Sequence, residues 1–135
     1  MRFTTILLLT TLACSVAHAA ASDEDESRKS GEAWLSLVDA QKYEESWKES
    51  SVQFRSAVTQ DQWASALKNA RDPLGPMVSR AQSRVNFTKT LRGAPDGDYV
   101  IFHFTTSFKN KEGVTERLTL VQEDGKWRVV AYAIH

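Results

Sequence analysis

The sequence has few of the residues that usually carry covalent or metal chemistry. Its 135 residues include one cysteine and three histidines. No two histidines have the close spacing of a zinc site, and neither a Gly-x-Ser-x-Gly motif nor a glycine-rich phosphate loop occurs. The common signatures of zinc enzymes, serine hydrolases and nucleotide-binding proteins are therefore absent. We predict no cofactor, no metal and no catalytic residue.

An excess of one charge is also absent. The 17 lysines and arginines balance the 17 acidic residues, so the formal net charge is zero. A chain without excess positive charge is not drawn to nucleic acid or to an anionic membrane surface. No apolar run is long enough to cross a bilayer as a helix. We therefore predict no nucleic-acid partner and no membrane span.

The N-terminus has the pattern of a secretory signal peptide. Arg2 precedes a short apolar stretch, and Ala17 and Ala19 occupy the two positions that a signal peptidase reads. Residues 1–19 are therefore predicted to be removed, which leaves a periplasmic or secreted chain without cysteine. The alternative is a lipoprotein anchored at Cys14, although Leu12 stands where that signal needs a small residue.

The mature chain is predicted to form one domain behind a short tail. Residues 20–29 contain the run Ser-Asp-Glu-Asp-Glu-Ser and precede any apolar periodicity. Adjacent carboxylates lack the alternating spacing and the glycine of a calcium loop, so we interpret this segment as a flexible acidic tail. Residues 30–135 can bury enough surface for a single ordinary core.

Three helices are predicted in the first half of this domain. Helical spacing of apolar residues begins in residues 33–38 and resumes in residues 43–54. A third helix begins at a capping box, in which Thr59 precedes Gln62 by three residues. It ends in residues 71–76, where two prolines and a glycine cannot continue a helix.

The second half of the domain has the pattern of a β-sheet. From about residue 80, apolar and polar residues alternate with a period of two. Turn sequences at 94–97, 109–113 and 124–125 separate four strands, which short connections make antiparallel. We therefore predict an α+β fold, with three N-terminal helices packed on a four-stranded antiparallel meander sheet.

The turn lengths also predict which residues oppose each other, and directly opposed residues share a face of the sheet. The expected pairs are Leu120 with Val129, Leu118 with Ala131, Phe104 with Leu118, and Phe87 with Phe104. One face is then apolar and packs on the helices. The other, outer face mixes apolar and charged residues, which is typical of an interface but also of an ordinary exposed sheet. Its candidate interface residues are Ile101, His103, Arg117, Val130 and Tyr132.

Short motifs spread over nearly the whole mature chain form a specific pattern. They are Ala33–Asp39 with Tyr43–Trp47, Phe54–Val58 with Trp63, Arg71–Gly75 with Val78–Arg80, Gly93–Tyr99, Thr106–Lys111 and Gly125–Val129. Over about residues 30 to 134, this pattern resembles a family of small bacterial secreted proteins known as domain of unknown function 4019. The resemblance implies no known activity and no established catalytic residue.

The order of helices and sheet also resembles, more distantly, the NTF2-like or cystatin-like α+β cone. Enzymes of that fold place an Asp or a His between the sheet and the helices. The predicted inner face has no titratable group on its three central strands, which argues against such an activity. Fold likeness alone says little about function.

We therefore expect a non-catalytic binding or interaction module that contacts a second copy or another protein through its outer sheet face. The alternative is a small-ligand binder, or an NTF2-like enzyme without a recognisable motif, that uses a cavity between sheet and helices. Ala131 and Ala133, opposite large aromatic residues, would leave room for such a cavity. Asp39 and Tyr43 are the candidate residues at its mouth.

Overall fold

The computed structural model describes the backbone of residues 15–135 and the side chains of residues 23–135. Cys14 and most of the predicted signal peptide lie outside the described residues. Within them, helices come first and strands follow. The elements are α1 (Ser15–Asp39), α2 (Tyr43–Lys48), α3 (Val52–Ala57), α4 (Gln60–Arg71), the 3₁₀ turn η1 (Asp72–Leu74), β1 (Met77–Thr88), β2 (Tyr99–Phe108), β3 (Lys111–Glu123) and β4 (Lys126–Ile134).

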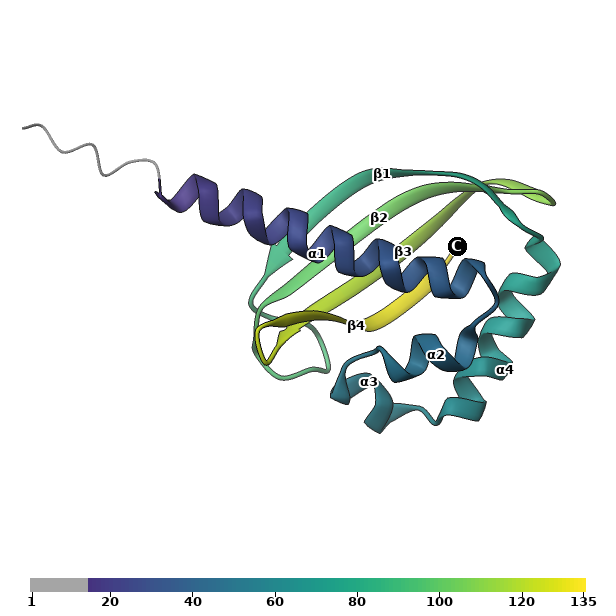
Figure 1. Ribbon diagram of the computed structural model, residues 1–135, viewed down its shortest axis with the longest axis horizontal. Helices are drawn as coiled ribbons and strands as arrows, with labels where there is room; N and C mark the ends of the chain where they lie inside the picture. Colours follow the sequence, from purple (N-terminus) through teal and green to yellow (C-terminus); the bar gives the residue numbers. More distant parts are fainter. Residues whose placement is uncertain (1–14) are drawn as a thin grey trace, which may run out of the picture.

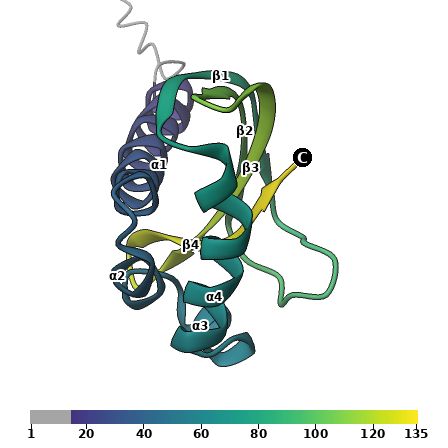
Figure 2. The same ribbon diagram turned by 90° about the vertical axis from the view of Figure 1, so that its right-hand side faces the viewer.

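The helices all lie on one face of a single sheet (Figure 1, Figure 2). The strand order is β1-β2-β3-β4, and every neighbouring pair is antiparallel. The long helix α1 crosses the strands, while α2, α3 and α4 gather near one end of the sheet (Figure 1). The predicted α+β class and the meander are confirmed. No helix within residues 15–135 is long and apolar enough to cross a membrane.

The helix layer has four α-helices in the described residues instead of the predicted three. The second predicted helix is divided at Ser50 and Ser51. Ser51 caps α3, because its side chain accepts a hydrogen bond from the backbone N–H of Phe54. Its own N–H donates to the carbonyl of Val129 at 2.8 Å, which ties the break to strand β4. This contact also covers part of the free edge of β4.

The acidic segment is not the flexible tail that the sequence suggested, because α1 runs through it. Within residues 23–29, the carboxylates of Glu24 and Asp25 pair with Arg28 one turn later. Such pairs at i,i+3 and i,i+4 stabilise a helix. Ser27 in the same turn is fully buried. Local ion pairs and packing on the sheet therefore order a segment that lacks apolar periodicity.

The core lies between α1 and the inner face of the sheet. Gly31 allows the closest approach, since a Cβ atom at this position would lie 3.0 Å from Leu118 Cδ2. The fully buried apolar side chains around this contact come from α1, β2 and β3 and are Leu35, Val38, Val100, Phe102, Leu118 and Leu120. Close contact between helix and sheet thus depends on a residue without a side chain.

The observed register differs from the predicted one in its details. Leu120 opposes Val129, as predicted. Leu118 was predicted to oppose Phe104, but it opposes Phe102. The reason is that β2 and β3 continue to a Phe108–Lys111 pair, so that the turn between them has two residues. Phe87 opposes Val100 and not the predicted Phe104, because the connection between β1 and β2 spans residues 89–98. Both shifts are by an even number of residues, so the predicted faces survive here.

Two β-bulges reverse the faces further along the edge strands. Ser83 is an extra residue in β1, between the Gln82–Phe104 and Arg84–His103 pairs. Val130 is an extra residue in β4, so that Leu118 opposes Tyr132 instead of the predicted Ala131. A bulge places two residues against one and changes the face of all that follow. The prediction that Tyr132 lies on the outer face is therefore wrong, and it points toward the helices.

We predict that Gly31→Leu lowers the free energy of unfolding by about 1–3 kcal/mol, because a side chain here must push α1 off the sheet or displace Leu118. The overpacking is expected to outweigh the gain of roughly 1 kcal/mol in helix propensity. Urea unfolding measures the change. The matched control is Glu32→Leu at the next, exposed position. Equal stability of the two variants would contradict close packing at Gly31.

Candidate functional site

A buried group of charged side chains lies where α1 and α4 end against the sheet. Glu116 on β3 is fully buried, with the alternation of the strand placing it between Val114 and Leu118 on the inner face. The two bulges bring Arg80 from β1 and Tyr132 from β4 to the same face. We call this group the inner polar cluster, and it consists of Asp39, Arg71, Arg80, Thr106, Glu116 and Tyr132.

Glu116 is the centre of the inner polar cluster. Arg80 Nε lies 2.7 Å from Glu116 Oε1, and the hydroxyls of Thr106 and Tyr132 donate to the same carboxylate. Arg71 Nη1 forms a longer ion pair with Glu116 Oε2 at 3.7 Å. Burial raises the pKa of the Tyr132 hydroxyl, and the neighbouring carboxylate raises it further. Tyr132 therefore remains a neutral hydrogen-bond donor to Glu116.

Asp39 joins both arginines at the end of α1. Its Oδ2 lies 2.8 Å from Arg80 Nη1, and its Oδ1 lies 2.7 Å from Arg71 Nη2. Burial opposes ionisation of Asp39, but the hydrogen bonds from Arg80 and Arg71 outweigh it and hold its pKa below the usual value. The Arg71 guanidinium also lies 4.7 Å from the ring centroid of Phe108, in the geometry of a cation–π contact.

The inner polar cluster is balanced in charge, with two carboxylates against two guanidinium groups. All four carboxylate oxygens of Asp39 and Glu116 accept a hydrogen bond from an arginine, and Tyr132 also donates to Glu116. A catalytic base or nucleophile needs access to substrate, which a fully buried and paired Glu116 lacks. The arrangement is that of a structural ion-pair network. The prediction of an inner face without titratable groups is nevertheless wrong.

The two residues predicted at a cavity mouth do lie together. Asp39 and Tyr43 line a depression of about 380 Å³, together with Arg71 and Asp72. The Tyr43 hydroxyl donates to Asp72 Oδ1 at 2.8 Å. Burial and this hydrogen bond raise the pKa of Tyr43 to about 12. The sequence thus located one exposed edge of the inner polar cluster, without its buried centre.

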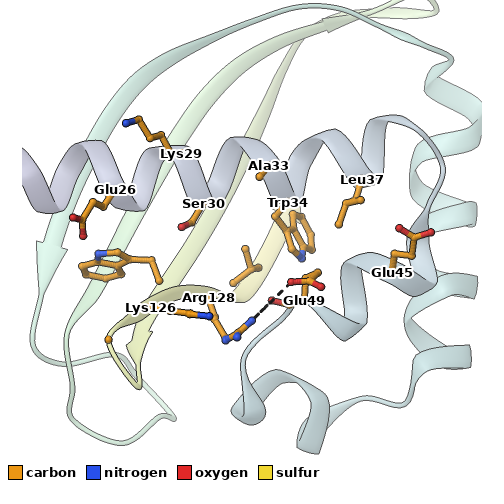
Figure 3. A pocket seen from close by; sticks show the side chains of 13 residues that line it. Glu26, Lys29, Ser30, Ala33, Trp34, Leu37, Glu45, Glu49, Lys126 and Arg128 are labelled. Carbon is orange, nitrogen blue, oxygen red and sulfur yellow. Dashed lines mark hydrogen bonds and ion pairs between the residues drawn. The ribbon is translucent and has the colours of Figure 1, made fainter.

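A larger groove lies between α1, α2 and the β3–β4 turn (Figure 3). We call it the α1–β4 groove, and its volume is about 660 Å³. Its apolar walls are Ala33, Trp34, Leu37, Trp127 and Val129. Its charged rim consists of Glu26, Lys29, Glu45, Glu49, Lys126 and Arg128. Apolar walls with polar groups around them are typical of sites for small amphipathic molecules.

Hydrogen bonds and ring packing inside the protein hold Trp34, one of the walls of the groove, in place. Trp34 Nε1 donates to the carbonyl of Ser46 at 2.9 Å and to Ser50 Oγ at 3.0 Å. The other side of the Trp34 ring packs edge-on against Tyr132, at 5.3 Å between ring centroids. The groove therefore shares a wall with the inner polar cluster. Trp127 Nε1 is buried without a hydrogen-bond partner in the described residues.

The outer sheet face carries the other predicted interface residues. Ile101, His103 and Val130 are partly buried there, and Arg117 is exposed. Tyr99, also on this face, is buried beneath the connection between β1 and β2, and its hydroxyl donates to the carbonyl of Pro95 at 2.6 Å. No contact in the structure tests an interface, so that role stays a prediction. Among residues 23–135, no three His, Cys, Asp or Glu side chains are placed to hold a metal.

We predict that Glu116→Gln destabilises the protein by roughly 3–5 kcal/mol, because it leaves two buried arginines with one carboxylate. Urea unfolding compares it with Glu112→Gln, a variant of an exposed carboxylate on the same strand. The control is expected to change stability by about 0.5 kcal/mol or less. A small effect for both variants would show that the inner polar cluster does not hold the fold together.

Comparison with known proteins adds one match. A family model described as a protein of unknown function (DUF4019) matches residues 30–132, which is more than half of the chain. No curated protein matches the chain. The matched residues include the whole inner polar cluster and all the apolar walls of the α1–β4 groove, but not Glu26 and Lys29 of its rim.

Proposed function

The chain belongs to the DUF4019 family of proteins of unknown function, and we propose that it is a secreted, non-catalytic module that binds a small amphipathic ligand in the α1–β4 groove. The groove itself carries this proposal. Its volume of about 660 Å³ falls within the range of small-molecule sites. Its walls are apolar and include the edges of the largely buried Trp34 and Trp127, and the rim offers both signs of charge.

The rim supports a ligand with an apolar body and a polar end. Arg128 lies 3.9 Å from a carboxylate oxygen of Glu49 and 3.8 Å from one of Glu123, so part of its charge is already neutralised. Lys29 and Lys126 form no ion pair among the described residues. Lys126 can meet an anionic end of the ligand while the body of the ligand packs on the apolar walls. Figure 3 shows Lys126 beside Arg128 on the β3–β4 side of the groove, whereas the Lys29 side chain extends from the opposite side of α1.

A binding role without catalysis agrees with the chemistry of the lining residues. Among residues 23–135, no histidine, cysteine or tyrosine lines the groove. Its three glutamates, Glu26, Glu45 and Glu49, are exposed to water, where a carboxylate is a weak general base. The shielded acids of the protein, Asp39 and Glu116, are engaged with arginines outside the groove.

We predict that Ala33→Trp weakens ligand binding by about tenfold or more, because a large side chain fills the groove from an exposed position on α1. The probe is 8-anilinonaphthalene-1-sulfonate, an amphipathic anion whose fluorescence rises in apolar sites. Titrations compare wild type, Ala33→Trp and the control Ala66→Trp, which changes an exposed alanine on α4. Near-ultraviolet circular dichroism checks that each variant is folded.

Unchanged binding in Ala33→Trp, or an equal loss in Ala66→Trp, would contradict the proposed site. Native mass spectrometry of the protein purified under gentle conditions gives a second readout. A mass excess present in wild type and absent from Ala33→Trp would identify a retained natural ligand. The two measurements are independent, since the first uses an added probe.

The secreted location predicts a defined mature product. In a Gram-negative host, the isolated protein is expected to begin at Ala20 and to carry no lipid, because Ala17 and Ala19 form the cleavage site. Intact mass measurement tests this product. Cys14→Ser is the control, since it leaves signal-peptidase processing unchanged but abolishes lipoprotein maturation. Loss of processing in Cys14→Ser would assign the protein to the lipid-anchored class.

A further inference from the structure

Three basic residues stand side by side on the outer sheet face, opposite the helices. Arg84 on β1 pairs with His103 on β2, and His103 pairs with Arg117 on β3. Directly opposed residues share a face and lie about 5 Å apart between Cβ atoms. Arginine side chains are long enough to converge over a central histidine at this spacing. We call these three residues the outer basic row.

The β1 bulge creates this row. Arg80 and Arg84 are four residues apart, so a regular strand would place both on one face. The extra residue Ser83 separates them, and Arg80 points into the inner polar cluster while Arg84 stands beside His103. Ser83 Oγ donates to the carbonyl of His103 at 3.1 Å, which fixes the bulge against the centre of the row. Bulges often re-aim a side chain at functional positions.

The charges of the outer basic row have no counter-ion among the described residues. The ion pairs of residues 23–135 involve neither Arg84 nor Arg117. On β1, β2 and β3, the neighbouring outer-face positions contain no acidic residue and are Ala81, Asn86, Ile101, Thr105, Thr115 and Thr119. Like charges placed opposite each other destabilise a sheet. The row therefore costs stability in the free protein.

The surroundings of His103 lower the pKa of its side chain. Burial lowers the pKa of its imidazole, and the positive charges of Arg84, Arg117 and His135 lower it further. Arg84 belongs to β1 and Arg117 to β3, so each of the two strands beside β2 contributes a cation, and His135 follows β4. The Nδ1 atom of His103 is buried without a hydrogen-bond partner in the described residues.

We propose that the outer basic row binds a single phosphate-class oxyanion, held between Arg84 and Arg117 above His103. Guanidinium groups match the oxygens of phosphate with paired hydrogen bonds. Thr105 and Thr115 supply hydroxyl donors beside the row. This site is independent of the α1–β4 groove, which lies on the opposite side of the sheet.

The extent of the row favours one small dianion over a polymer. A nucleic acid or an acidic protein surface needs positive charge along its whole contact. On β1, β2 and β3 the charge is confined to one row, because the rows on both sides have no charged side chain on these strands. One phosphate group, free or at the end of a small molecule, balances two arginines without further cations.

Nuclear magnetic resonance titration of His103 tests this proposal with inorganic phosphate as the probe. The pKa of His103 is measured in phosphate and in chloride at equal ionic strength. A bound anion favours the protonated imidazole, so phosphate is expected to raise the pKa of His103 by about one unit relative to chloride. The difference between the two salts is expected to disappear in Arg84→Gln and in Arg117→Gln.

The control variant is Arg55→Gln, which removes an exposed arginine on α3. It is expected to keep the phosphate-dependent rise. Comparing the two salts within each variant removes the direct effect of the lost arginine on His103. Both substitutions in the row are at exposed positions, and circular dichroism confirms the fold.

Two results would overturn the proposal. One is an equal pKa of His103 in phosphate and chloride in the wild-type protein. The other is a phosphate-dependent rise that persists in both Arg84→Gln and Arg117→Gln. A short glutamate peptide provides a further arm. If it raises the pKa of His103 where phosphate does not, the row is a docking surface for an acidic polypeptide instead.

Discussion

The buried charge of Glu116 is the constraint to which much of the structure responds. A carboxylate removed from water is stable only when cations and hydrogen-bond donors surround it. Those partners come from α4, β1, β2 and β4, and Asp39 at the end of α1 balances the second arginine. One ionised group thus fixes how both helix ends meet the sheet. An apolar residue at 116 would pack on the same strand but would not define these positions.

Much of the fold was predictable from the sequence because its signals are local. The capping box at Thr59, the turn at Asp124-Gly125 and the alternation in β3 each depend on residues close together in the chain. The bulges at Ser83 and Val130 have no comparable signal, since any residue can be the extra one. The inner-face position of Glu116, in contrast, could have been predicted from the sequence. Its position between Val114 and Leu118 places it on the apolar face by simple alternation.

The inner polar cluster and the α1–β4 groove are connected through Trp34. The Trp34 ring lines the groove and packs edge-on against Tyr132, which donates to Glu116. Hydrogen bonds from Nε1 to Ser46 and Ser50 fix the ring further. A wall held in this way is formed before any ligand arrives, so binding loses little side-chain entropy. In the proposed binding role, the buried ion pairs would contribute indirectly, by holding the shape of the groove.

The same bulge that completes the inner polar cluster leaves charge unbalanced outside it. Arg80 and Arg84 are close in sequence, yet Arg80 finds two carboxylates and Arg84 finds none. The zero net charge of the chain hides this difference, because its acidic residues concentrate elsewhere, including residues 23–26 of α1. A sheet face that keeps opposed cations loses stability unless an anion joins them. The extra residue Ser83 thus accounts both for the burial of Arg80 and for the exposure of Arg84.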